Sequence, residues 1–588
     1  MKPLLRISKL ATPYWKQILA SLFLLTTVVF LDLIIPRLVQ RIIDQGILKN
    51  DVRVITQTTW LMLGISFISM LFSIGNNIFS VQVGESFGRD LRERLFIKMQ
   101  DFSFGNLDRM KTGQLLVRLT SDTSIVQRVV QMFLRIGTRA PLLMLGSIFL
   151  MFLTNAHLAF LILLLLIFTT LVIVAFVTRT GPLYLVVQQK LDRLNTLLQE
   201  NISGVRVIKA FVRADYENQR FSTANQDFAE NTIRVTQIMS ILFPILSALM
   251  NIGVVVVIWS GGISAINGKL TIGEIVAFAN YLLTTIGPLG IMAQLSTVIA
   301  SGMASAGRIE QVLDEPAEIQ DALVDWPSDH SLQGRVVFEN VNFHYSGTSD
   351  EPVLQDISFV AEAGQSVAIL GATGAGKSTL VSLIPRFYDV TSGMISIDGM
   401  DIRLIPQDVI LENIGLAMQE TVLFSGTIYE NISYGKQDAS KAEVMEAAMA
   451  AQAHDFIMEL PLGYDTPVEQ RGVNLSGGQK QRLAIARAIL LKPRILILDD
   501  STSSVDVETE TRIQDALEKL ILDCTSFIVA QRISTVLNAD KILVIDKGRL
   551  VAQGTHSQLM RTSPIYQEIF ESQLGNGPDV RSQELEND

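Results

Sequence analysis

Six apolar segments in the first half of the chain constrain its fold more than any other feature of the 588 residues. Each is long enough to cross the roughly 30 Å hydrocarbon core of a bilayer, which takes about 20 helical residues. Backbone buried in hydrocarbon must satisfy its own peptide groups, so these segments are predicted to be transmembrane helices. We place them near residues 18–39, 60–81, 136–154, 158–177, 238–263 and 272–292.

The composition agrees with a membrane protein. Mean hydropathy is +0.35, and only 18% of the residues are charged, compared with about 25% in soluble domains. The net charge of −10 and the lack of a basic stripe argue against nucleic-acid binding. A single cysteine, Cys524, excludes an intrachain disulfide, so nothing in the sequence indicates an oxidising compartment.

The connections between the six segments predict their orientation. Those after the second and fourth segments are tens of residues long, and each carries at least eight lysines and arginines. The opposite side offers only Arg41, Lys49, Arg53 and Lys269. The positive-inside rule therefore places the long connections and both termini in the cytoplasm. Both connections have helical periodicity and are expected to turn near Asp108 and Gly204. We predict that these turns dock onto a cytoplasmic domain; solvated hairpins are the alternative.

Asp32, Arg135 and Arg139 are charged residues in or at the edge of predicted spans. Asp32 lies inside the first, and Arg135 and Arg139 lie one helical turn apart at the start of the third. Charges in a bilayer are costly and indicate a lined cavity or pathway unless they reach the surface. We expect the two arginines to extend to the cytoplasmic surface. For Asp32, a pathway or gating role and a structural role are equally compatible with the sequence.

From about residue 334 the pattern changes to alternating strands and helices. The apolar segment 366–370 runs directly into the sequence GATGAGKST at residues 371–379. Glycines let backbone amides wrap phosphates, Lys377 would reach the terminal phosphates, and Ser378 would ligate Mg²⁺. The sequence therefore predicts a site for ATP with Mg²⁺. The expected nucleotide-binding residues are Gly371, Thr373, Gly374, Ala375, Gly376, Lys377, Ser378 and Thr379, with Tyr345 placed upstream to stack on adenine.

A neighbouring strand is expected to supply the metal partner. The apolar segment 495–498 ends at Asp499, whose carboxylate would point at Mg²⁺ together with Ser378. Asp500 follows, where a phosphate-hydrolysing site is expected to carry glutamate. After the next apolar run, Gln531 stands where histidine is expected.

The sequence LSGGQ at residues 475–479, followed by KQRLAIAR, carries a family resemblance. Combined with the phosphate-binding loop, it resembles the signature of ATP-binding cassette transporters, and the resemblance covers almost the whole chain. Six spans with two long cytoplasmic connections and one cassette are similar to an exporter half-transporter. The resemblance implies that Gln419 links Mg²⁺ to the membrane domain and that residues 503–506 touch an opposing cassette. The turns near Asp108 and Gly204 would be coupling helices.

The expected fold is a six-span α-helical transmembrane domain with long cytoplasmic helices, followed by an α/β phosphate-loop nucleotide-binding domain. The corresponding ranges are a transmembrane domain at 1–310, a linker at 311–333, a cassette at 334–574 and a polar tail at 575–588.

The family resemblance gives Asp500 and Gln531 a consequence for mechanism. In this family two cassettes face each other, and each ATP lies between the phosphate loop of one and the signature of the other. Asp500 keeps the charge of the expected glutamate but is one methylene shorter, and a displacement of ~1 Å can cost ~100-fold in rate. Gln531 donates a hydrogen bond but cannot carry the charge or proton of an imidazole. We expect the chain's own site to bind ATP and hydrolyse it poorly.

An intact signature beside an impaired site favours a heterodimer, as in the degenerate-site subunit of bacterial heterodimeric multidrug exporters. The partner would be a second half-transporter with the competent glutamate and histidine. The residues offered to its ATP site are Ser476, Gly477, Gly478 and Gln479. The predicted function is export of an amphipathic or hydrophobic compound, a drug or a lipid, across a bacterial cytoplasmic membrane. The alternatives are a homodimeric lipid flippase and a nucleotide-sensing regulatory subunit without net transport.

Overall fold

The computed structural model describes residues 2–319, 331–345, 352–501, 505, 507–520 and 524–574. The chain divides into two compact units. The first, Met1–Gln100 with Gly113–Glu315, is helical, and the second, Asp101–Thr112 with Pro316–Asp588, is an α/β domain. The short segment Asp101–Thr112 thus belongs to the α/β unit, although the chain on both sides of it belongs to the helical unit.

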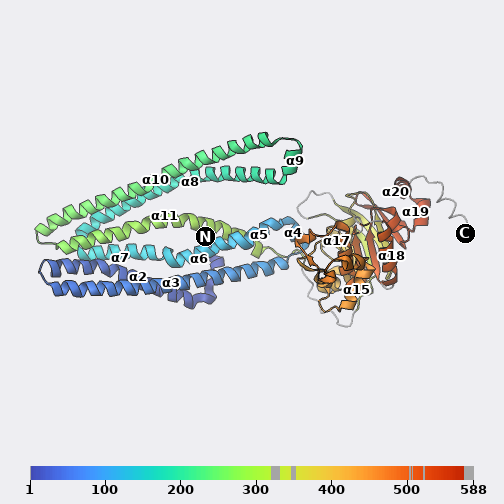
Figure 1. The fold of residues 1–588 in the computed structure, drawn as a ribbon, viewed down its shortest axis with the longest axis horizontal. Helices are drawn as coiled ribbons and strands as arrows, with labels where there is room; N and C mark the ends of the chain where they lie inside the picture. Colours follow the sequence, from blue (N-terminus) through green and yellow to red (C-terminus); the bar gives the residue numbers. More distant parts are fainter. Residues whose placement is uncertain are drawn as a thin grey trace. The chain divides into compact units, whose positions relative to one another are not determined.

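Long helices that run side by side form the helical unit (Figure 1). They are α1 (Lys2–Ser8), α2 (Trp15–Arg41), α3 (Val52–Gln100), α5 (Thr112–Val117), α6 (Thr123–Met132), α7 (Arg139–Thr154), α8 (Ala156–Ser203), α9 (Val205–Ala210), α10 (Ala214–Ile266) and α11 (Ile272–Asp314), with a 3₁₀ turn η1 (Lys9–Tyr14) and π turns η2 (Ile42–Ile47), η3 (Arg118–Asp122) and η4 (Phe133–Gly137).

Five stretches of the described helices are long and apolar enough to cross a membrane. They are Pro3–Ile47, Val52–Gln100, Thr112–Thr154, Ala156–Ser203 and Ala214–Ile266. A sixth, shorter apolar segment, Ile272–Thr285, begins the 43-residue helix α11. The six predicted spans are therefore helical, the last of them as the first part of a longer helix.

The helices of the second long connection extend well past a bilayer's thickness. Helix α10 has 53 residues and is about 80 Å long at 1.5 Å per residue. It runs beside α8, and the two are joined through α9 (Figure 1). An ion pair between Lys190 and Asp227 (2.8 Å) and a hydrogen bond from Asn201 to Glu217 (2.9 Å) hold them together. The predicted helical form of this connection is confirmed.

Polar residues cap the helices that follow the short connections, at the starts of α8 and α11. Asn155 begins α8 and accepts a hydrogen bond from the Leu158 amide (3.1 Å). Thr271 and Glu274 form a capping box at the start of α11. The Asp44 carboxylate, in the π turn η2 that follows α2, accepts from the Thr271 hydroxyl and the Gly273 amide. These contacts fix the start of α11 against η2.

One of the charged residues in the predicted spans has a partner that the sequence did not predict. Arg139 Nη2 forms an ion pair with Asp32 Oδ2 at 2.9 Å. The Ser69 hydroxyl donates a hydrogen bond to the other oxygen of Asp32 at 3.2 Å. Pairing lowers the cost of placing a charge in hydrocarbon, so a partner within reach competes with extension to water. Arg135, in the π turn η4, is exposed.

Two main sheets form the α/β unit. The strands are β1 (Val336–Phe343), β2 (Leu354–Ala361), β3 (Ser366–Leu370), β4 (Ser392–Ile397), β5 (Met400–Asp401), β6 (Ile414–Ala417), β7 (Gly426–Thr427), β8 (Pro467–Val468), β9 (Ile495–Asp499), β10 (Thr525–Val529), β11 (Lys541–Asp546) and β12 (Arg549–Gly554). One sheet has the order β2-β1-β4-β5 with antiparallel pairs, and a six-stranded sheet has the order β12-β11-β3-β10-β9-β6. In the latter, all strands but β12 are parallel. The near-continuous apolar runs of β3 and β9 are typical of parallel strands buried on both faces.

The helices of this unit include α4 (Phe104–Arg109), α12 (Lys377–Leu383), α13 (Gln407–Glu412), α14 (Ile428–Ile432), α15 (Lys441–Ala450), α16 (His454–Glu459), α17 (Gly477–Leu490), α18 (Val507–Leu520), α19 (His556–Thr562) and α20 (Pro564–Leu574). One apolar core joins the two main sheets through residues such as Phe338, Ile369 and Ile395. A second core packs α15 and α17 against the six-stranded sheet.

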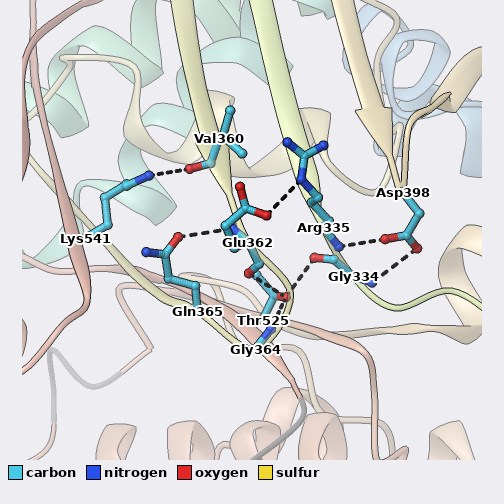
Figure 2. A network of polar contacts seen from close by, with 9 residues as sticks. All are labelled: Gly334, Arg335, Val360, Glu362, Gly364, Gln365, Asp398, Thr525 and Lys541. Atoms are coloured by element: carbon cyan, nitrogen blue, oxygen red, sulfur yellow. Dashed lines mark hydrogen bonds and ion pairs between the residues drawn. The ribbon is translucent and has the colours of Figure 1, made fainter.

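Thr525, the first residue of β10, pins the two sheets together (Figure 2). Its buried hydroxyl donates to the Gly334 carbonyl (2.7 Å), just before β1, and accepts from the Gly364 amide (3.0 Å), between β2 and β3. Asp398 holds the same turn by accepting from the Gly334 and Arg335 amides. This network lies at the amino ends of β3 and β10 and leaves their carboxyl ends free for a ligand.

We expect Thr525→Val to destabilise the α/β unit, because the isosteric side chain leaves the buried Gly334 carbonyl and the partly buried Gly364 amide without this partner, at a cost of about 1–3 kcal/mol. The midpoint of its thermal transition in the full-length chain should fall by about 2–10 °C. Thr562→Val is the control, because that hydroxyl bonds only within an exposed helical turn. Equal midpoints for the two variants would contradict the role given to Thr525.

Candidate nucleotide-binding site

Four neighbouring parallel strands bring the predicted site residues to one edge of the sheet. Strands β3, β10, β9 and β6 lie in that order and end before Gly371, Gln531, Asp500 and Gln419 respectively. In open α/β sheets, ligands bind outside the carboxyl ends of the strands. The fold therefore collects residues that are more than a hundred positions apart in the sequence.

The loop after β3 has the close backbone approach that its glycines predict. A Cβ atom at Gly371 would lie 2.1 Å from the Ile545 carbonyl oxygen, so a larger residue cannot stand there without a shift. Gly374 and Gly376 have φ values of +83° and +101°, in the region that favours glycine. Lys377 Nζ donates to the Gly371 and Ala372 carbonyls (2.8 and 3.0 Å), which bends its ammonium back over the loop. Burial lowers the pKa of Lys377.

Ser378 and Asp499 meet as expected for a shared Mg²⁺ site. The Ser378 hydroxyl donates to Asp499 Oδ1 at 2.9 Å, and Asp499 is buried at the end of β9. Burial raises the pKa of Asp499. Among the described residues no group of three His, Cys, Asp or Glu side chains forms a metal cluster. One carboxylate, one hydroxyl and phosphate oxygens are the ligands that Mg²⁺ prefers, so the residues present fit Mg²⁺ with ATP.

A cavity of about 290 Å³ opens at this edge. Its lining residues are Val353, Thr373, Gly374, Gly376, Lys377, Ser378, Thr379, Gln419, Asp500, Val529 and Gln531. Gln419, predicted from the family resemblance, thus shares the cavity with the phosphate-binding loop. Gly371, Ala375 and Asp499 lie behind this lining and shape or support the loop.

Asp500 and Gln531 are bonded to each other. Gln531 Nε2 donates to Asp500 Oδ2 at 2.6 Å, so the amide contacts the carboxylate from the adjacent strand end. The Asp500 backbone has φ +47° and its amide donates to the Val529 carbonyl (3.1 Å). Burial raises the pKa of Asp500, with Lys377 and Gln531 opposing the shift. The two residues that depart from the expected hydrolytic site therefore form one unit.

Tyr345 lies beside the loop but outside this cavity. Its hydroxyl is 3.0 Å from Thr379 Oγ1, and its ring contacts Phe343 and Tyr388 edge-on at centroid distances of 4.9 and 5.2 Å. It lines a neighbouring cavity, also of about 290 Å³, together with His344 and Tyr388. Stacking of Tyr345 on adenine stays a prediction.

The signature residues stand apart from the cavity. Ser476 caps α17, where Ser476 and Gln479 form a capping box. Ser476 and Gly477 are exposed, and Gly478 and Gln479 are half-buried. None of these four described residues lines the cavity of the same chain. Of the segment expected to touch an opposing cassette, Ser503, Ser504 and Asp506 lie outside the described residues.

The first predicted docking turn is confirmed. Helix α4 belongs to the α/β unit, where Phe104 stacks on Phe387 with centroids 4.0 Å apart. The Tyr388 hydroxyl donates to Asp108 Oδ2 at 2.6 Å. The second turn, α9, exposes Val207 and Phe211, at 61% and 73%.

Sequence reasoning missed Gln573, near the end of α20. Its Nε2 donates to the Gln531 carbonyl (2.8 Å), and its Oε1 accepts from the Ile533 amide (2.7 Å). Helical periodicity of Tyr566, Ile569 and Phe570 was the only available signal, and it marks an apolar face without identifying a glutamine at its end.

Comparisons with known proteins agree with this architecture. Residues 18–289 match the family described as the ABC transporter transmembrane region, and residues 354–503 match the family described as ABC transporter. The uncharacterized ABC transporter ATP-binding protein YfiB of Bacillus subtilis is 40% identical over 94% of this chain and 96% of its own length. The ATP-dependent lipid A-core flippase of Syntrophus aciditrophicus is 34% identical over 97% and 94%. A solved structure of a bacterial Atm1-family ABC exporter with ATP bound is similar to this chain, with a TM-score of 0.82 and 28% identity. The match covers 95% of this chain and 98% of the exporter chain.

We expect the affinity for Mg²⁺ in the presence of ATP to weaken as pH falls, beginning above the ordinary aspartate pKa of about 3.9. The raised pKa of Asp499 means that it keeps a proton to higher pH, and the metal needs the ionised carboxylate. Titrating Mg²⁺ between pH 5 and 8 tests this. Asp499→Asn is the control, because it removes the titration of this carboxylate. The pH dependence of Mg²⁺ affinity that remains in the variant arises from protonation of ATP itself. The same pH profile in the variant and the wild type would contradict the assignment.

Proposed function

Because the chain belongs to the ABC transporter family and has the domain order of an exporter half-transporter, we propose that it is the weakly hydrolysing half of an ATP-driven exporter. One observation carries the proposal: Asp500 and Gln531 occupy the positions of the expected glutamate and histidine in an otherwise complete site.

The chain's own residues are arranged to hold Mg²⁺ with ATP. The backbone of residues 371–376 would wrap the phosphates, and Lys377 would exchange its carbonyl partners for phosphate oxygens. Ser378, Asp499 and Gln419 would face the metal, which when bound neutralises negative charge on the phosphates. Tyr345 would stack on adenine after its ring turns toward the loop.

The same geometry supports slow hydrolysis. The shorter side chain of Asp500 sets its carboxylate back from the position of the expected glutamate, and a displacement of ~1 Å can cost ~100-fold. One of its oxygens already accepts from the Gln531 amide. Gln531 keeps Asp500 oriented but cannot accept a proton or become charged as an imidazole does. The site is therefore suited to retaining ATP.

The signature supports a partner. Ser476, Gly477, Gly478 and Gln479 stand outside the chain's own cavity, at the exposed start of α17. They would complete an ATP site whose phosphate loop, glutamate and histidine come from a second half-transporter. Most hydrolysis would occur at that site.

The second turn supports association with another chain as well. Val207 and Phe211 line an apolar hollow of about 480 Å³ beside α9, and exposed contiguous apolar surface marks an interaction site. We propose that α9 docks on the partner's cassette while α4 engages its own. Closure of the cassettes on ATP would then reach the long helices. We propose that both termini and the cassette lie in the cytoplasm, at the inner membrane of a bacterium, and the positive-inside charge pattern supports this orientation.

The cargo we propose is an amphipathic or hydrophobic compound that enters from the cytoplasm or the bilayer. The long apolar helices support this class. Similarity to a lipid A-core flippase favours a lipid as the second candidate, with a homodimer as its assembly.

We expect the double variant Asp500→Glu with Gln531→His to raise ATP turnover of the purified chain by about 10- to 100-fold, because it restores the reach of the carboxylate and the imidazole. Each single change should give less, since the two side chains act as a pair. Lys377→Ala in the double variant is the control and should abolish the gain. A wild-type chain that alone turns over as fast as the double variant would contradict the impaired site and favour the homodimer.

In the transporter purified with its partner, Ser476→Asn should lower ATP turnover by at least about tenfold, while Lys377→Ala in this chain should lower it less. Asparagine preserves the helix cap, so the loss reports on the neighbouring ATP site and not on folding. A larger loss of ATP turnover in Lys377→Ala than in Ser476→Asn would show that most hydrolysis occurs at this chain's own site.

A further inference from the structure

We propose that Gln573 is a positioning residue for the loop that carries Gln531, so that helix α20 controls how firmly this cassette holds ATP. The inference deepens the proposed function at the same ATP site and rests on that site binding Mg²⁺ with ATP. It assigns a role to a side chain that lies on the last described helix, outside the phosphate-binding loop and the signature.

The contact is two-pronged. Gln573 Nε2 donates to the carbonyl of Gln531, and Gln573 Oε1 accepts from the amide of Ile533. The two backbone groups flank Arg532, so one side-chain amide clamps the loop on both sides of that residue. Arg532 in turn donates to Glu510 and to the Val505 carbonyl at 3.2 and 3.3 Å. The loop is held from α20 on one side and from α18 on the other.

The packing of one face of α20 holds in place the helix that carries Gln573. Tyr566, Ile569 and Phe570 share a helical stripe with Gln573, at spacings of three, four and seven residues. The first three pack in one cluster with Ile533 and Val536, which begin directly after the loop and are 1% and 0% exposed. The Tyr566 hydroxyl is 2.7 Å from His556 Nδ1, and burial raises its pKa to about 12. The apolar residues of the stripe fix α20, and Gln573 connects this helix to the backbone of the loop.

The path from Gln573 to the ATP site is short. Gln573 holds the carbonyl of Gln531, and the side-chain amide of the same residue donates to Asp500. Gln531 and Asp500 both line the cavity. Freeing the backbone of Gln531 would let its side chain leave Asp500 and the end of the cavity where the terminal phosphate is expected.

The test uses the full-length chain in lipid nanodiscs and two rates. Amide hydrogen exchange of the segment 531–536 reports the clamp, and dissociation of Mg²⁺ with ATP reports its effect on the site. In Gln573→Ala we expect loop exchange at least about fivefold faster, the factor typical of one lost hydrogen bond. ATP release should be about three- to tenfold faster, and ADP release should change less because ADP lacks the terminal phosphate.

Two further variants separate positioning from folding. Gln573→Glu keeps the acceptor for the Ile533 amide and loses the donor to the Gln531 carbonyl. It should release ATP faster while the Ile533 amide stays protected. Gln567→Ala, on the same helix, removes a side chain that bonds to the Met560 carbonyl, and both rates should stay at wild-type values.

Unchanged loop exchange in Gln573→Ala would overturn the clamp. Faster exchange with unchanged ATP release, or ADP and ATP release that accelerate equally, would overturn its role at the site. Failure of the proposed function would be seen in a separate measurement. If the chain alone hydrolysed ATP rapidly, its site would not be impaired, but the comparisons of loop exchange and of ATP with ADP release between variant and wild type would still test the role of Gln573.

Discussion

The parallel register of β3, β10, β9 and β6 is the constraint on which the candidate site depends. It brings the phosphate-binding loop, Gln531, the Asp499–Asp500 pair and Gln419 to one edge. A slip of one residue in β9 would turn Asp499 away from Ser378, since side chains alternate between the faces of a strand. Thr525, by tying both sheets together at the opposite end of β10, keeps this register in place.

Much of this arrangement follows from the sequence because its signals are local. The glycines of the loop, the apolar run before Asp499 and the spacing of the membrane segments each require no knowledge of distant contacts. The ion pair between Arg139 and Asp32 joins residues 107 positions apart, and periodicity cannot reveal such a partner. The packing of α4 in the α/β unit depends likewise on Phe387 and Tyr388, which carry no marker of that role.

The bond between Gln531 and Asp500 indicates how, in the proposed function, the site would lose catalysis and keep binding. Phosphate and metal contacts would come from the loop, Lys377, Ser378 and Asp499, and the hydrogen bonds of Lys377 and Ser378 involve neither Asp500 nor Gln531. The two departures from the expected site would affect the group proposed to activate water, where a small displacement costs the most in rate. Burial also raises the pKa of Asp500, which makes its charged form less favourable before any ligand binds.

The placement of the signature supports the proposed second cassette, whether it belongs to another copy of this chain or to a different half-transporter. Ser476 caps the start of α17. The Gln479 backbone amide donates to the Ser476 hydroxyl, and the Ser476 backbone amide donates to Gln479 Oε1. The start of this helix faces outward with Ser476 and Gly477 exposed, while the cavity of the same chain is lined by other residues. Donors at an exposed helix start suit the phosphates of a facing site. In the proposed function, this donor set would therefore serve a partner whose own carboxylate and imidazole are complete.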